Sequence, residues 1–329
     1  MAQVTVELNA IYDCSKAALI KHGATVHVAS EVAKAIRKAE SVGNLICGLY
    51  YLESYCIQLR SGRVNGDVEP IVTKPKIASV QVDARFGFAQ PAFAAGLPVA
   101  LKTAHEAGSC SLAICHSHTC TSLGYFTEQI AHAGLIGIGF TNASPVVSPP
   151  GGNTAVIGTN PIAMSVPAKS GGVAFQFDQS TSAVALGKIT MAASAGQDIP
   201  LGWAVDANGR PTTDPQAALK GSLVSTGGYK GWGFGLMGEI LAAAVTGSVN
   251  SLDVSGLKVA EGKPHDLGQF YFLLDPTTFS GDAFWDRLAR VSDAVAAQEG
   301  TRLPGTDKAE PDQVEINAAV WASVQKLAG

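Results

Sequence analysis

A long segment of this chain, from Gln129 to Ala168, contains no aspartate, glutamate, lysine or arginine. A membrane-spanning helix needs roughly 20 predominantly apolar residues in a row. Here the segment is interrupted by Pro145, Pro149, Pro150 and Pro161, with glycine and asparagine between them. The segment therefore predicts buried strands joined by tight turns, in a protein that does not contact a membrane.

The charge of the whole chain is also low. Charged residues make up 15% of the sequence, against about 25% in an average soluble domain, and 47% of the residues are hydrophobic. The formal net charge is −4, which argues against a nucleic-acid-binding protein, since those usually carry a basic excess. Disorder needs low hydrophobicity and high net charge. The composition instead indicates a globular protein that buries part of its surface against a partner subunit.

The residue pattern predicts helices at both ends of an α/β chain. Apolar spacing predicts one helix that ends at Gly23, a second that is capped by Thr25, and a third that ends at Gly62. Runs of β-branched residues and prolines begin near residue 66, and helical spacing returns after residue 280. We therefore predict a helical domain from residues 1–75 and 280–329. Residues 76–279 are predicted to form a β-rich cofactor-binding region with a helical subdomain.

The cysteines and the first residues of the chain bear on its location. Six cysteines in 329 residues do not resemble a disulfide framework. The first residues show no basic segment followed by an apolar run, so no signal peptide is expected. We predict a reduced, cytoplasmic protein.

Several short motifs have competing interpretations. The spacing of His116 and His118, next to Cys115 and Cys120, matches no common zinc pattern, and we predict no metal site. Glycines 233, 235 and 238 match G-x-G-x-x-G, but the residues before them form a poor strand, which favours helix packing over a dinucleotide site. Glycine turns near residues 151–161 and 227–231 are either ordinary tight turns or phosphate sites.

Segments along nearly the whole chain resemble the type-2 malate/L-lactate dehydrogenase-like oxidoreductases, in family order. The branch that is most similar is the Δ1-piperideine-2-carboxylate/Δ1-pyrroline-2-carboxylate reductases, on FGFAQPA and LAICHSH. The resemblance implies a non-Rossmann NAD(P)-binding domain with a mostly antiparallel central sheet, flanked by helical segments from both chain ends. It also implies a homodimer that uses NADPH or NADH and a small imino or oxo acid. The other matching segments are LRSGRVNG, VDARFGFAQPA, SHTCTSLGYFTEQIAHAGLIGIGFTNASPVVSPPGG, IGTNPIAMSVP, FDQSTSAVALGKI, VDANGRPTTDP, GGYKGWGFGLMGEILAAAVTG and LGQFYFLLDP.

The resemblance also implies which residues contact the cofactor. They lie in five short segments that keep the residue character of the family. These residues are His118, Thr119, Cys120, Thr121, Ser122, Leu123, Thr159, Asp178, Gln179, Ser180, Tyr229, Lys230, Arg302, Leu303, Pro304 and Gly305.

The chain departs from the family where proton transfer takes place. The family carries Ser-His-Gly there, with an arginine four residues after the histidine; the histidine donates a proton and the arginine binds the substrate carboxylate. This sequence has Ile46-Cys47-Gly48, followed by Tyr51. Lys188 is the first candidate for the carboxylate partner, and Tyr51 could donate a hydrogen bond. Cys47 is either a weak acid or a small buried apolar residue.

The loss of the histidine favours one substrate class over another. Reduction of a ketone forms an alkoxide that must be protonated, and a positioned acid contributes about 100- to 10,000-fold. A protonated cyclic imine already carries its proton, so the absence of the histidine slows its reduction less than that of a ketone. We therefore expect an NAD(P)H-dependent reductase of Δ1-pyrroline-2-carboxylate or Δ1-piperideine-2-carboxylate, which yields L-proline or L-pipecolate. The alternatives are a 2-oxo acid/2-hydroxy acid dehydrogenase with a relocated acid and a non-catalytic cofactor-binding homologue.

Overall fold

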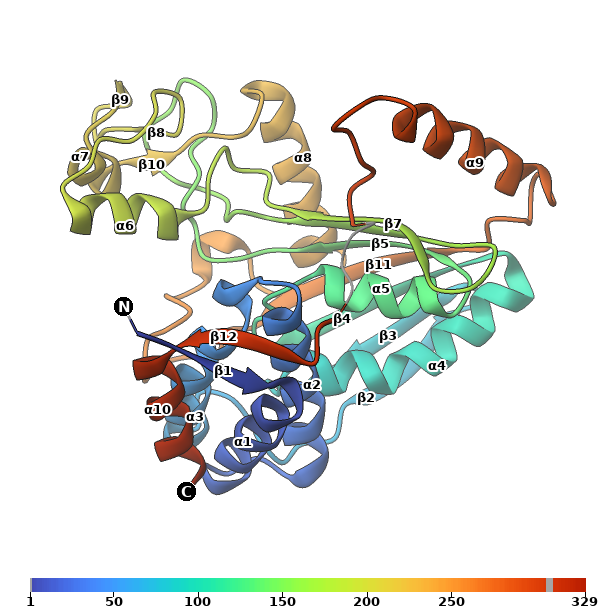
Figure 1. The fold of residues 1–329 in the computed structure, drawn as a ribbon, viewed down its shortest axis with the longest axis horizontal. Coiled ribbons are helices and arrows are strands. Elements are labelled where there is room, and N and C mark those ends of the chain that lie inside the picture. The colour runs from blue at the N-terminus through green and yellow to red at the C-terminus, as the bar shows by residue number, and fades with distance from the viewer. Residues whose placement is uncertain (1, 306–309) are drawn as a thin grey trace.

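The computed structural model describes residues 2–305 and 310–329. Its centre is a seven-stranded mixed sheet (Figure 1) in the order β2-β3-β4-β11-β5-β6-β7. Strands β3 and β4 run parallel, and every other neighbouring pair in this sheet is antiparallel. The predicted α/β fold with a central sheet is confirmed. The strands span Ile71–Lys76, Ser79–Asp83, Ser109–Ser117, Leu267–Leu274, Ile136–Thr141, Ile162–Pro167 and Val173–Gln179, in the order β2, β3, β4, β11, β5, β6 and β7.

Two helices cover one face of this sheet, α4 (Ala89–Ala107) and α5 (Gly124–His132). The Phe93 ring of α4 contacts the rings of Phe126 on α5 and Tyr271 on β11 edge-on, with centroids 4.9 and 5.1 Å apart. All three side chains are buried, and burial of each large aromatic ring stabilises the fold by about 2–3 kcal/mol.

Both ends of the chain meet in a second layer below the sheet (Figure 1). Strand β1 (Gln3–Glu7) pairs with β12 (Gln313–Asn317), and their helices share one apolar core. Thr25 caps α2 by accepting from the Val28 N–H at 3.3 Å, and Gly62 ends α3 at φ 76°, so both predicted helix boundaries are confirmed. These helices are α1 (Leu8–Lys21), α2 (Val26–Ser41), α3 (Leu52–Ser61) and α10 (Ala318–Ala328), with the short turns η1 (Leu45–Cys47) and η2 (Leu49–Tyr51) between α2 and α3.

A smaller unit with its own core lies on the other side of the sheet from the layer that holds both chain ends (Figure 1). Its helix α8 contains the G-x-G-x-x-G glycines. A Cβ at Gly235 would lie 2.7 Å from Ile157, which supports close packing as the role of that glycine. The unit comprises α6 (Leu186–Ala195), β8 (Ala204–Val205), β9 (Pro211–Thr212), α7 (Pro215–Lys220), β10 (Ser222–Leu223) and α8 (Tyr229–Glu239), followed by η3 (Ile240–Ala244) and η4 (Ser251–Asp253).

Two elements lie elsewhere than the predicted domain boundaries suggest. Strand β2 starts within residues 1–75 but joins the central sheet through β3. Helix α9 (Ala283–Ala296) lies apart from α1, α2, α3 and α10 (Figure 1), and none of its residues is buried. Among the described residues, no helix combines the length and apolarity that a membrane crossing requires.

Candidate active site

The turn between α2 and α3 carries Cys47 and Tyr51, and a buried glutamate determines its shape. Glu40 of α2 accepts a hydrogen bond from the Leu49 backbone N–H at 2.7 Å. A side chain at Gly48 would collide with the Glu40 carboxylate and displace it from its bond to the Leu49 N–H. Burial raises the pKa of Glu40. Cys47 and Tyr51 therefore project from a turn that Glu40 helps to hold.

Cys47 and Tyr51 are both protonated at neutral pH. Burial, with a smaller contribution from the nearby Asp178 carboxylate, raises the pKa of Cys47 to about 12. Burial also raises the pKa of Tyr51 to about 12, and its ring stacks on that of Tyr55 with centroids 5.8 Å apart. An efficient general acid has a pKa near the operating pH. Neither side chain is a good proton donor at pH 7.

His118, just after β4, is buried and neutral. Gln58 donates to the Leu257 and Val259 carbonyls at 2.8 Å, so its side-chain oxygen faces His118 and accepts from Nε2 at 2.6 Å. The other ring nitrogen, Nδ1, is a buried acceptor without a partner among the described residues. Burial, followed by the neighbouring His265, lowers the pKa of His118 well below its usual range.

An apolar groove of about 590 Å³ lies beside the turn. Tyr50 and Ile46 line it from the turn, and α6 and α10 close its other sides. Lys188 lies in the first turn of α6, next to Gly187, which lines the groove. Its side chain is exposed, and within the described part of the chain no hydrogen bond or ion pair joins it to Cys47 or Tyr51. The structure places Lys188 near the groove without bringing it onto the turn.

A different lysine reaches the turn. Lys258 lies in the loop after η4, and its ammonium is 3.0 Å from the centroid of the Tyr50 ring and 5.0 Å from that of Tyr51. It also donates to the Tyr50 carbonyl at 3.3 Å. Sequence reasoning missed Lys258, because nothing in the spacing of the loop links it to residues some 200 positions earlier.

Three of the predicted cofactor segments lie next to one another. The Asp178 carboxylate accepts from the Gly124 N–H at 2.8 Å and from the Ser122 hydroxyl at 3.2 Å. The 302–305 turn joins the same strand, because the Gln176 N–H donates to the Pro304 carbonyl at 2.9 Å. A polar cavity of about 290 Å³ opens between β7, α5 and the end of α2, and its lining also includes Lys38, Asn44, Tyr125 and Glu128.

The glycine turn before α8 forms a separate polar feature. Gly227 and Gly228 have φ values of 62° and 66°, which favour glycine. Tyr229 and Lys230 are exposed in the first turn of α8. Free backbone N–H groups at a helix start, with an ammonium beside them, suit a phosphate group. No described contact joins this turn to Ser122.

The remaining predicted cofactor residues differ in their exposure. The Thr159 carbonyl accepts from the Thr181 N–H at 2.9 Å, and the Ser180 hydroxyl donates to the Ser182 carbonyl at 3.3 Å. The side chains of Cys120 and Leu123 are buried in the core between the sheet and the helices α4 and α5, so only their backbone atoms are available to a ligand. The others lie in the turn after β4 or at the end of β7: Thr119, Thr121 and Gln179.

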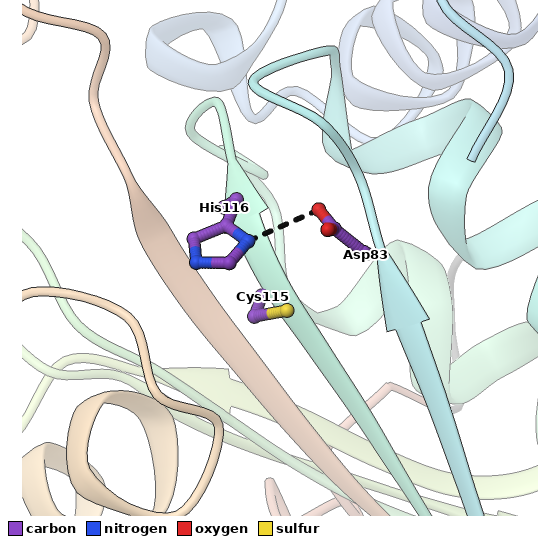
Figure 2. Close-up of side chains that lie close together, drawn as sticks. All are labelled: Asp83, Cys115 and His116. Atoms are coloured by element: carbon purple, nitrogen blue, oxygen red, sulfur yellow. Dashed lines mark hydrogen bonds and ion pairs between the residues drawn. The ribbon is translucent and has the colours of Figure 1, made fainter. Parts of the chain in front are cut away.

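Asp83, Cys115 and His116 form the cluster drawn in Figure 2, with ligand atoms within 4.8 Å of one another. His116 has φ 51°, and its Nδ1 lies 3.0 Å from Asp83 Oδ1. The same oxygen accepts from the Arg85 N–H at 2.8 Å, and the Cys115 thiol donates to the Val82 carbonyl at 3.6 Å. Burial and the nearby Asp83 raise the pKa of Cys115 to about 11. Protein groups thus already bind these side chains, and the expected absence of a metal stays a prediction.

Comparison with known proteins identifies the family. The malate/L-lactate dehydrogenase family matches residues 6–324. The chain belongs to this family of oxidoreductases, so the resemblance predicted from the sequence is confirmed.

Individual relatives narrow the comparison. The chain is 40% identical over 280 residues to a (2R)-3-sulfolactate dehydrogenase (NADP(+)) from Chromohalobacter salexigens, covering 84% of this chain and 83% of that protein. It is 33% identical to a Δ1-pyrroline-2-carboxylate reductase from Ancylobacter novellus, over 98% of this chain and 97% of that protein. The crystal structure of Δ1-piperideine-2-carboxylate reductase from Pseudomonas syringae superimposes with a TM-score of 0.91 at 32% identity, covering 98% and 99% of the two chains.

Proposed function

We propose that this chain is an NADPH-dependent reductase of a cyclic 2-imino acid, either Δ1-pyrroline-2-carboxylate or Δ1-piperideine-2-carboxylate. NADH is the alternative cofactor. The observation that carries the proposal is the protonation state of Cys47 and Tyr51. Each has a pKa of about 12 and therefore keeps its proton at neutral pH. Reductases of these imines among the relatives support the substrate class.

The chemistry of the imine fits a site without a neutral-pH acid. A bound reduced nicotinamide supplies a hydride to the C=N carbon of the protonated imine. The electron pair of the C=N π bond moves to nitrogen, and the product is a neutral secondary amine that later takes a proton from water. No side chain must release a proton during the reduction. Cys47 and Tyr51 then contribute only uncharged surface to the substrate site. The carboxylate of the substrate still needs a cation to bind it.

The cofactor site is proposed to be of a non-Rossmann type. A Rossmann domain uses a mostly parallel sheet with phosphates at a helix N-terminus after the first strand. Here the corresponding position at α5 is occupied by the Asp178 carboxylate, which would repel a phosphate. The exposed start of α8, with Lys230, offers the alternative for phosphate groups.

The proposal predicts the following activity. Purified protein should consume NADPH with enzymatically generated Δ1-pyrroline-2-carboxylate, and turnover with pyruvate should be lower by about 100-fold or more, because only the ketone needs a general acid. The measurement is the loss of NADPH absorbance, run beside NADH.

A second candidate follows from the most identical of these relatives: oxidation of (2R)-3-sulfolactate with NADP⁺. The apolar lining of the groove beside Tyr50 disfavours a substituent that carries a second negative charge. Turnover of (2R)-3-sulfolactate without turnover of the imine would replace the proposal with this candidate. Binding of NADPH without turnover of either substrate would favour the non-catalytic alternative.

We also propose that the protein is a homodimer, with α9 at the interface. One side of α9 carries apolar residues at helical spacing, and Val291 among them is 58% exposed. A second copy would remove this surface from water. The side includes Phe284, Leu288, Val291 and Val295.

The dimer proposal predicts that L288E combined with V291E shifts the protein from dimer to monomer, because charged side chains cannot be buried without partners. Light scattering after size-exclusion chromatography measures this. R290E, which changes the opposite side of α9, should leave the mass unchanged. A monomeric wild type, or a double variant that stays dimeric, would contradict the assignment of α9.

A further inference from the structure

The family's arginine is replaced by Tyr51, yet the structure retains a positive charge beside that position. The ammonium of Lys258 lies 5.0 Å from the centroid of the Tyr51 ring and 3.0 Å from that of Tyr50. The family's guanidinium would project from the same backbone position as the Tyr51 ring. The Lys258 ammonium therefore lies beside the position that the family's arginine would occupy.

The position of Lys258 results from an extensive set of hydrogen bonds. Arg63, which is 1% exposed, donates from Nε to the Lys263 carbonyl and from Nη1 to the Gly256 and Val259 carbonyls. It also donates to the Ser255 hydroxyl. These bonds bracket Lys258 on both sides along the chain.

Two further side chains of α3 bind the same loop. Gln58 donates to the carbonyls of Leu257 and Val259, the two neighbours of Lys258, at 2.8 Å each. Ser61 donates to the Ala260 carbonyl at 2.6 Å. Helix α3 begins directly after Tyr51, so the helix that follows the altered turn also holds the loop that supplies the lysine.

Lys258 has the properties of a carboxylate-binding group. It is exposed, and within residues 2–305 and 310–329 no carboxylate lies within ion-pair distance of its ammonium. Its contacts are the faces of two tyrosine rings and one carbonyl, which orient a cation without neutralising it. Tyr50 and Tyr51 both line the apolar groove, and the Lys258 ammonium contacts both rings, so the cation lies next to the groove.

We propose that Lys258 binds the carboxylate of the substrate and takes the place of the arginine that Tyr51 has replaced. The inference rests on the proposed function for the identity of the substrate. It assigns to Lys258 the role that the sequence alone suggested for Lys188. The substrates that fit this site carry one carboxylate next to a compact apolar ring or chain.

The kinetic test compares K258M with K258R and K188M. Methionine keeps the apolar stem and removes the charge. We expect K258M to raise KM for Δ1-pyrroline-2-carboxylate by about 10- to 100-fold, the range of one hydrogen bond to a charged group. The Kd for NADPH should not change, and K258R should keep most of the affinity. K188M should behave as wild type. A rise in KM for K188M with none for K258M would overturn the proposal.

A rescue variant separates substrate binding from a structural role. Adding Tyr51→Arg to K258M should lower KM again, because it restores a cation at the same place. A loop that had merely lost its shape would not be repaired by a new side chain on the turn. Absence of rescue, together with a lower thermal midpoint for K258M than for K258R, would overturn the carboxylate role.

A binding measurement keeps this inference distinct from the proposed function. Pyrrole-2-carboxylate and pyrrole-2-carboxamide are planar five-membered rings that differ in charge. Calorimetry with NADPH present should show binding of the carboxylate to wild type, weaker binding to K258M, and little binding of the amide to either. This pattern without turnover of the imine would reject the proposed reaction and support the carboxylate site. Equal binding of the carboxylate to wild type and K258M would reject the site, whichever substrate is turned over.

Discussion

Combining Cys47→His with Tyr51→Arg is expected to raise kcat/KM for pyruvate and other 2-oxo acids by about 100- to 10,000-fold. The histidine would supply a proton donor whose ordinary pKa of about 6.5 is close to neutral. The thiol that it replaces has a pKa of about 12 and keeps its proton at neutral pH. The arginine would add a charge-assisted, two-pronged contact to the carboxylate. Steady-state kinetics with saturating NADPH measures the change.

The backbone is suited to accept these two side chains. The turn keeps Gly48, and it is held by the Glu40 bond to the Leu49 N–H and by backbone hydrogen bonds, which do not use the side chains of Cys47 and Tyr51. The matched control is Cys47→Ser with Tyr51→Phe, which changes the same positions without adding an acid or a cation. A folded double variant that binds NADPH but gains no activity on pyruvate would show that the family's proton-donor site is not at this turn.

Local features of the fold could be predicted from the sequence, while the order of the strands could not. The cap at Thr25 and the left-handed residue at Gly62 follow from residue chemistry within a few positions, and both are present. Strand β11 lies between β4 and β5, although it comes more than 120 residues after either. Such a pairing depends on the packing of whole layers, which no local pattern contains.

The candidate site divides in the same way. The family pattern names Ser122 and Asp178 as cofactor contacts, which stays a prediction, and the fold brings the two side chains together. Lys258 lies in no segment that matches the family pattern. Its position depends on Arg63 and Gln58, which bind its loop from some 200 residues away. The pattern predicted that a cation was missing, and only the folded chain shows which lysine is near.

The stacked pair His118 and His265 is expected to make the folded protein sensitive to mild acid. Their ring centroids are 3.9 Å apart with an interplanar angle of 16°, and both side chains are buried. Burial, with a smaller contribution from Arg63, lowers the pKa of His265 to about 3. Burial and His265 lower the pKa of His118 in the same direction. Both rings are therefore neutral in the folded protein, whereas each would be protonated near pH 6.5 once unfolded.

Because the pKa of both histidines is lower in the folded protein than in the unfolded chain, acid favours the unfolded chain. Stability from these groups is fully present above pH 6.5 and is lost as the pH falls toward the folded value of about 3. At 1.36 kcal/mol per pH unit, His265 alone should cost about 3 kcal/mol of unfolding free energy at pH 4. The measurement is urea unfolding of the cofactor-free protein between pH 7 and pH 4.

His265→Phe is the decisive variant. Neither ring nitrogen of His265 has a hydrogen-bond partner of good geometry among the described residues, and the Leu257 backbone offsets only part of the lowering of its pKa. A phenyl ring can keep the stack on His118 without the need to stay unprotonated. His265→Phe should therefore match wild type at pH 7 and exceed it by about 3 kcal/mol at pH 4. His27→Gln, at an exposed position on α2, should follow the wild-type curve. If His265→Phe loses stability in parallel with wild type down to pH 4, the acid sensitivity arises from groups other than this pair.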